Sequence, residues 1–169
     1  KASEDVVTET MDVAAVDAFQ NSADGEKLKN SMKRRGLKGL AFWHNGMKQM
    51  SANKPLIMPE DAKGLKFRVQ ASDVLVAQFE QLGANPQKMS FKEVYGGLQT
   101  GVIDGQENTW SNIYGKKFFE VQDGVTETNH GILDYLVVTS SKWWDELPAD
   151  VRDQLGTILA EVTATRNGE

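Results

Sequence analysis

The 169-residue sequence contains no cysteine. This absence excludes disulfide bonds, cysteine-based metal sites and catalysis by a thiol. Long apolar segments are also missing: no run approaches the roughly 20 residues needed to span a bilayer, so we expect no membrane insertion. The first residues, Lys1 to Asp5, show no basic region followed by an apolar one. We therefore expect any signal peptide to have been removed or never to have been part of this sequence.

The sequence contains fewer basic than acidic residues. Lysine and arginine together number 19, against 24 aspartates and glutamates, which gives a formal net charge of -5. No dense stripe of lysine and arginine overcomes this field locally, so we expect no nucleic-acid partner. Hydrophobic residues make up 40% of the chain and charged residues 25%, which is typical of a globular protein with one core or two small lobes.

Motifs for catalysis and cofactor binding are absent as well. The sequence lacks the G-x-S-x-G, G-x-x-x-x-G-K-S/T and G-x-G-x-x-G patterns. His44 and His130 are the only histidines. Neither lies at a metal-ligand spacing, and we interpret both as surface or structural residues. We expect no cofactor, no metal site and no catalytic residue. An enzyme that uses one histidine with a nearby carboxylate is the competing hypothesis.

The first third of the chain has the apolar spacing of helices. Short stripes predict helices over 13–19 and 28–32, and Gly36 is a plausible helix end. Residues 37–43 predict a short strand, and the polar segment 44–54 predicts a loop.

From Pro59 onward, strand-like and helix-like patterns alternate. Residues 65–70 alternate apolar and polar side chains, which predicts a half-buried strand. Further predictions are a helix capped by Ser72 and ended by Gly83, a capping box at 90–93, a strand at 102–104, a helix at 111–119, a buried strand at 132–139 and an amphipathic helix that begins at Pro148. This alternation predicts an α/β fold.

Two polar positions could carry a binding function. Arg68 lies near the carboxyl end of its strand, where open α/β sheets place ligands and where a guanidinium could hold a carboxylate through two hydrogen bonds. From its position alone, an exposed arginine in a surface salt bridge is the favoured interpretation. The polar stretch 104–110 follows a short apolar segment. It could line a pocket or form a turn that caps a helix, and both remain open.

Five blocks of sequence carry a resemblance to a known family: residues 42–50, 59–69, 91–108, 117–122 and 128–130. The segment L-Q-T-G-V-x-D-G-Q-E-N within the third block is far more specific than a lone short motif. Read in order, the blocks resemble the solute-binding proteins of TRAP (tripartite ATP-independent periplasmic) transporters, of which the C4-dicarboxylate-binding proteins are the best-known members. The likeness runs from about residue 12 to residue 161.

The resemblance implies a periplasmic-binding-protein-like α/β fold, with mixed sheets flanked by helices, one lobe largely complete and the other partial. Residues 1–36 would be a helical segment leading from a truncated N-terminal lobe. Residues 37–133 would be the ligand-binding lobe, and residues 134–169 would hold a return strand and a C-terminal helix. Family members close two lobes around their ligand.

The implied function is the capture of a small carboxylate in the periplasm, with a C4-dicarboxylate such as succinate, malate or fumarate as the first expectation. The implied partners are that ligand and the membrane subunits of a TRAP transporter. Sialic acid, a uronate or an ectoine-like compound is the alternative ligand, and a fragment that binds nothing is the alternative outcome.

The resemblance also implies which side chains hold the ligand. These are Arg68 for the carboxylate, Asn108 as a hydrogen-bond donor, Phe91 as an apolar wall, Lys48 as a second cation, and Gln70 and Trp110 as neighbouring candidates. The implied role reverses the interpretation of Arg68 that its position alone favours. A lysine at position 48 keeps the charge but lacks the bidentate geometry of arginine.

Overall fold

The structure is a computed structural model that describes residues 13–168. The expectation for Lys1 to Asp5 therefore lies outside the described residues. The chain divides into two compact units. Unit 1 comprises the residues up to Gly46 together with those from Leu133 onward, and unit 2 comprises Met47–Ile132.

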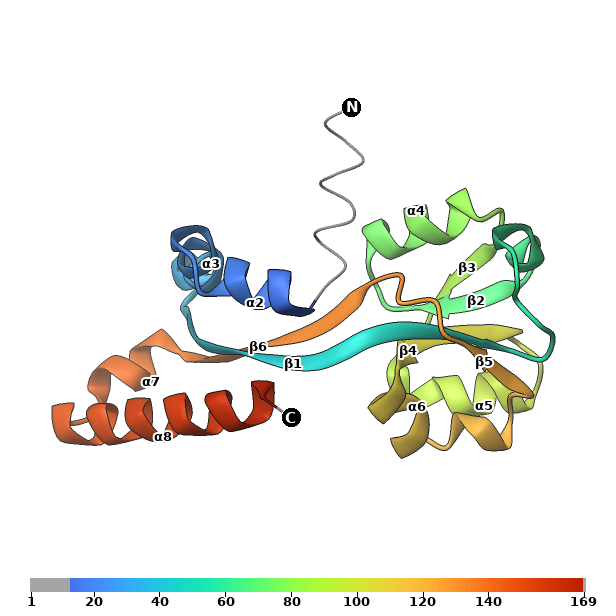
Figure 1. Ribbon diagram of the computed structural model, residues 1–169. Coiled ribbons are helices and arrows are strands. Elements are labelled where there is room, and N and C mark those ends of the chain that lie inside the picture. The colour runs from blue at the N-terminus through green and yellow to red at the C-terminus, as the bar shows by residue number, and fades with distance from the viewer. Residues whose placement is uncertain (1–12, 169) are drawn as a thin grey trace, which may run out of the picture. The chain divides into compact units, whose positions relative to one another are not determined.

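Unit 2 is built on a mixed sheet with helices on both faces. Its strands are the second half of β1 (Leu37–Ala52), β2 (Lys66–Val69), β3 (Asn85–Lys88), β4 (Gly105–Thr109) and β5 (Gly124–Thr126), in the order β3-β2-β4-β1-β5. β2 is parallel to β3 and β4, whereas β1 is antiparallel to β4 and β5. Helix α4 (Asp73–Gln81) lies on one side, and α5 (Val94–Gln99) and α6 (Trp110–Gly115) lie on the other (Figure 1). This arrangement confirms the predicted α/β fold.

Local sequence signals account for several boundaries in unit 2. The Ser72 hydroxyl accepts a hydrogen bond from the Leu75 amide, which confirms the predicted cap of α4. Gly83 follows that helix with a φ of +69°, a conformation that favours glycine. The Ser90 hydroxyl instead donates to the Glu93 carboxylate and caps no backbone amide, so that half of the predicted capping box is wrong. The other half forms, because the Glu93 carboxylate accepts a hydrogen bond from the Ser90 backbone amide. Three 3₁₀ turns complete the unit: Pro59–Ala62, Phe91–Glu93 and Phe118–Glu120.

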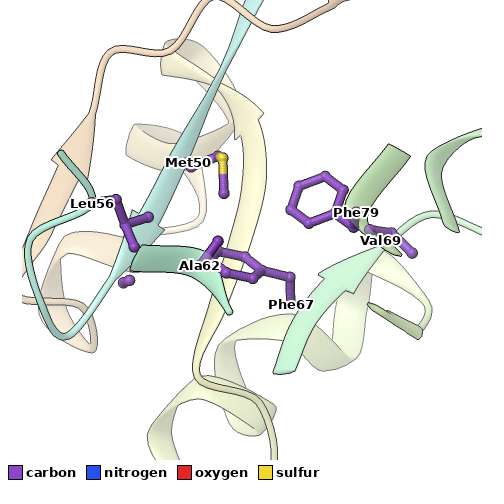
Figure 2. Packing of buried hydrophobic residues seen from close by; sticks show 7 residues of the cluster. Met50, Leu56, Ala62, Phe67, Val69 and Phe79 are labelled. Atoms are coloured by element: carbon purple, nitrogen blue, oxygen red, sulfur yellow. The ribbon is translucent and has the colours of Figure 1, made fainter. Parts of the chain in front are cut away.

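Two apolar clusters hold unit 2 together. In the first, Met50, Phe67 and Phe79 converge, and the two phenyl rings lie 5.3 Å apart (Figure 2). The second contains Val94, Leu98, Ile103, Ile113 and Phe118. Each fully buried large side chain contributes roughly 1.5–3 kcal/mol, so these clusters fix the sheet and its helices as one body.

Unit 1 has the predicted helix near 13–19 and little buried surface, whereas the predicted helix over 28–32 is wrong because the helix there ends at Lys29. It contains α2 (Val13–Gln20), α3 (Ala23–Lys29), a 3₁₀ turn (Lys33–Arg35), the first part of β1, β6 (Ile132–Ser140), α7 (Ser141–Glu146) and α8 (Ala149–Asn167). Strand β6 pairs with β1. The prediction that residues 132–139 form a buried strand is wrong about burial, because no residue of β6 is buried. Helix α8 follows Pro148 as predicted, but none of its residues is buried either.

Three segments depart from the pattern-based prediction. β1 continues unbroken through 44–52, where a loop was expected, and residues 102–104 precede the strand rather than form it. The expected helix over 111–119 ends at Gly115, because Lys117 adopts a left-handed φ of 56°. Polar residues can form part of these strands because their hydrogen-bond partners lie on other strands, which a local sequence pattern does not contain. Gln106 Nε2, for example, donates to Ser51 Oγ at 2.9 Å.

Candidate ligand-binding site

The strand register sorts the polar residues of unit 2 onto two faces of its sheet. Paired residues on neighbouring strands share a face, and faces alternate along each strand. Arg68 pairs with Gln106, so Arg68, Gln106 and Asn108 share one face. Glu107 pairs with Met50, so Glu107 and Lys48 share the other. The residues that the sequence grouped as one site therefore belong to opposite faces of the sheet.

Arg68 is buried, with 2% of its surface exposed. The prediction of a half-buried strand is therefore wrong at this position. Its Nε donates to the Met89 carbonyl at 2.9 Å, while its Nη1 is buried without any hydrogen-bond partner among residues 13–168. Burial lowers the pKa of the guanidinium, and the negative charge of Glu107 opposes that shift. Because the ordinary pKa of arginine lies so high, the group stays charged, and an acceptor for its free donor would be strongly stabilised.

Asn108 lies on the same face of the sheet as Arg68, and hydrogen bonds to its side-chain oxygen hold it in place. Its Oδ1 accepts hydrogen bonds from Asn112 Nδ2 at 2.7 Å and from the Thr109 amide at 3.0 Å. An amide whose oxygen is engaged in this way presents its NH₂ group as a donor. The residue is 3% exposed, so this donor is fixed inside the protein.

The ring of Phe91 lies against two cations. The guanidinium carbon of Arg68 is 5.6 Å from the ring centroid, and Lys116 Nζ is 5.3 Å from it. Phe91 is itself held edge-on by Phe118 at 6.0 Å. Nothing in the sequence singled out Lys116, because its relation to Phe91 depends on the path of the chain after α6.

Lys48 is engaged in a buried ion pair. Its Nζ lies 2.6 Å from Glu107 Oε2, and both side chains are almost fully buried. His130 Nε2 lies 3.3 Å from the same carboxylate oxygen, and His130 Nδ1 lies 2.7 Å from Thr128 Oγ1. Glu107 thus neutralises Lys48 and orients His130. The sequence places these partners 59 and 23 residues apart, so no local pattern could have paired them.

The two weaker candidates lie at the surface. Gln70 follows β2 and is exposed, and Trp110 at the start of α6 is 49% exposed. Neither makes a contact that ties it to Arg68. Within residues 13–168, no group of three or more histidine, aspartate or glutamate side chains could hold a metal ion. None of the helices in that range is long and apolar enough to cross a membrane.

Comparison with known proteins shows to which family the chain belongs. Residues 10–169 match the family described as "Bacterial extracellular solute-binding protein, family 7" (DctP). The chain belongs to this family. The resemblance of the sequence blocks to TRAP solute-binding proteins is thereby confirmed.

Individual DctP-family proteins are similar over nearly the whole chain. The C4-dicarboxylate-binding periplasmic protein DctP of Vibrio cholerae is 82% identical over 158 residues, which cover 94% of this chain and 48% of that protein. The crystal structure of a TRAP periplasmic solute-binding protein from Shewanella oneidensis with bound succinate matches with a TM-score of 0.91 and 56% identity, covering 95% of this chain and 52% of that one. A Pseudomonas aeruginosa counterpart with bound L-malate matches with a TM-score of 0.91 and 47% identity, covering 94% of this chain and 55% of that one. The chain thus spans about half the length of these relatives.

Proposed function

We propose that this chain is the carboxylate-binding part of a periplasmic solute-binding protein that delivers a C4-dicarboxylate, such as succinate or malate, to the membrane subunits of a TRAP transporter. The observation that carries the proposal is the buried guanidinium of Arg68, whose Nη1 has no hydrogen-bond partner among the described residues. A buried, charged donor left unpaired is costly, and a ligand carboxylate removes that cost. The names of the V. cholerae and S. oneidensis relatives support this ligand class and location.

In this proposal one carboxylate of the ligand accepts hydrogen bonds from Arg68 and from the amide NH₂ of Asn108. The orphan Nη1 supplies charge, and the two bonds accepted by Asn108 Oδ1 fix the direction of the neutral donor. Phe91 limits water near the guanidinium, which strengthens the ionic interaction. Binding requires no covalent step, so we expect capture without turnover.

The experiment that tests the proposal is isothermal titration of the chain with succinate, L-malate and fumarate at low ionic strength. The Arg68→Ala variant should lose at least about 30-fold in affinity, because a desolvated charge pair is worth roughly 2–5 kcal/mol. Lys66→Ala removes an exposed cation from the same strand and should change affinity less than about twofold. Absence of heat with the unsubstituted chain, or equal binding by Arg68→Ala, would contradict the proposal.

A second candidate, a lyase, is favoured by one observation: His130 lies against Glu107 in an arrangement that could move a proton. We give it second place because Glu107 is already paired with Lys48 at 2.6 Å and is 1% exposed. Incubating L-malate with the chain and following fumarate by its ultraviolet absorbance decides between the two. Fumarate formation that Glu107→Gln abolishes would establish the enzyme and overturn capture without turnover.

Other organic acids are a variant of the same proposal. A sugar acid or sialic acid presents the same carboxylate to Arg68 and differs in the rest of the molecule. Competition by galacturonate or sialic acid against bound succinate distinguishes these ligands. A competitor that binds more tightly than succinate would keep the role of Arg68 and change the ligand.

A further inference from the structure

The proposed site raises the question of which group receives the second carboxylate of a dicarboxylate. The sequence suggested Lys48 as a second cation. In the structure, Lys48 pairs with Glu107 at 2.6 Å on the face of the sheet opposite Arg68. A cation already neutralised by a buried carboxylate has little attraction left for another anion.

A different lysine lies on the Arg68 face. Lys116 follows α6, the helix that begins directly after β4 and Asn108. Its Nζ lies 5.3 Å from the centroid of the Phe91 ring, the ring that the Arg68 guanidinium also approaches, at 5.6 Å. Phe91 is therefore in contact with a buried cation, Arg68, and with an exposed one, Lys116.

Lys116 also has the properties that a ligand-reaching cation needs. It is exposed, and it takes part in none of the ion pairs described for residues 13–168. Its flexible stem can swing its charge away from the ring toward an anion. The neighbouring Lys117, by contrast, is already 3.7 Å from Glu120.

We propose that Lys116 is the second cation of the ligand site and sets its preference for dicarboxylates over monocarboxylates. This inference rests on the proposed function, because it assumes that Arg68 holds the first carboxylate. Lys48, on this view, is a positioning residue: it balances Glu107, which in turn orients His130.

The test compares succinate with butyrate, which has the same four-carbon chain and one carboxylate fewer. Affinities of the unsubstituted chain, Lys116→Gln, Lys116→Arg and Lys117→Gln are measured by titration calorimetry. Lys116→Gln should weaken succinate about fivefold to tenfold and leave butyrate within about twofold, since a partly exposed charge pair contributes roughly 1 kcal/mol. Lys116→Arg should retain the preference for succinate, and Lys117→Gln should match the unsubstituted chain.

The outcomes separate this inference from the proposed function. If Arg68→Ala abolishes binding of both ligands but Lys116→Gln leaves the succinate-to-butyrate ratio unchanged, the role of Lys116 is overturned and that of Arg68 stands. An equal loss with Lys117→Gln would show a general charge effect and would also overturn it. If neither ligand binds the unsubstituted chain, both proposals fail.

The rival residue is tested with the paired replacement Lys48→Met/Glu107→Gln, which removes both buried charges with little change in volume. A drop in the succinate-to-butyrate ratio in this variant, with the ratio intact in Lys116→Gln, would assign the second cation to Lys48. Thermal unfolding of the variant, read by circular dichroism, checks that unit 2 is still folded, as expected when a buried ion pair is replaced as a whole.

Discussion

Asn108 shows how one hydrogen-bond acceptor can set the direction of a donor. Its Oδ1 holds two protein donors, so its NH₂ group is the part available to a ligand. In Asn108→Asp the two protein bonds remain possible, but the ligand would face a second carboxylate instead of a donor. We expect a loss of succinate affinity of at least about 100-fold, because a donor is lost and a like charge is added.

Titration calorimetry measures this loss, and Asn85→Asp provides the matched control. Asn85 is an exposed residue of β3, and its oxygen accepts from Gln87 within the same strand. The Asn85→Asp substitution adds the same negative charge to unit 2 at a position outside the proposed site. If both variants lost affinity equally, the net charge of the unit rather than the Asn108 amide would be responsible.

Asp61 makes a pH-dependent contribution to the stability of unit 2. Its carboxylate accepts hydrogen bonds from the amides of Ile57 and Met58, both at 2.8 Å, and these bonds hold the pKa of Asp61 below its ordinary value of 3.8. A carboxyl group with a lowered folded-state pKa stabilises the protein above the unfolded-state pKa. That contribution is lost as the pH falls through the folded-state pKa.

Asp61→Asn should therefore lower the thermal midpoint at pH 7, and the difference from the unsubstituted chain should shrink toward pH 3. Circular dichroism melts at several pH values measure it. Glu60→Gln removes the adjacent carboxylate, whose side chain makes none of the hydrogen bonds described for residues 13–168, and should show no such trend. A difference that stays constant from pH 7 to pH 3 would disprove the assignment.

At the scale of the secondary-structure elements, the spacing of apolar residues predicts those helices whose ends are set by contacts between residues close in sequence. Helix α4 with its Ser72 cap and helix α8 after Pro148 follow local rules and could be predicted. The continuous strand β1 could not, because its polar residues are satisfied from far along the chain. Gln49 Nε2, for example, donates to Asn129 Oδ1 at 2.7 Å.

The candidate site divides in the same way. The family blocks point to Arg68, Asn108 and Phe91 as ligand-binding residues, and that role stays a prediction. The structure places Arg68 and Asn108 on one face of the sheet, with the Phe91 ring against Arg68. The environment of each could not be predicted. The burial of Arg68 depends on Met89 and on the packing of Phe91, and the ion pair of Lys48 depends on Glu107. Charge pairing and burial arise from tertiary contacts, which a pattern of residue types does not contain.

The packing of α4 against the sheet gives a prediction at the same scale. Phe79 is fully buried, 5.3 Å from the Phe67 ring and 6.0 Å from the His130 ring. Phe79→Ala should cost about 3–5 kcal/mol of unfolding free energy, from lost burial and the cavity left behind. Urea unfolding measures it. Val74→Ala on the same helix, at a position that is 77% exposed, should change stability by less than about 0.5 kcal/mol.

At the scale of the whole molecule, the two units differ in how much apolar surface they bury. All residues of both apolar clusters belong to unit 2. Among the described residues of unit 1, the only buried ones are Gly25 and Gly39, so no large side chain there is fully buried. Phe19, Trp143 and Ile158 are about half exposed. Because burial of apolar surface is the main source of stability, unit 1 should open at a lower free energy than unit 2.

Hydrogen exchange followed by mass spectrometry tests this difference. We expect backbone amides of β6 and α8 to exchange at least about tenfold faster than those of β2 and β4, although α8, with 19 residues, is much longer than either strand. Phe79→Ala should speed exchange in unit 2 and leave α8 unchanged, which shows that the units respond separately. Equal protection of α8 and β4 would mean that unit 1 is stabilised by something other than buried side chains. A fluorescent probe of exposed apolar surface gives a second reading. We expect it to bind strongly, because apolar side chains of unit 1 are exposed, and weak binding would contradict that expectation.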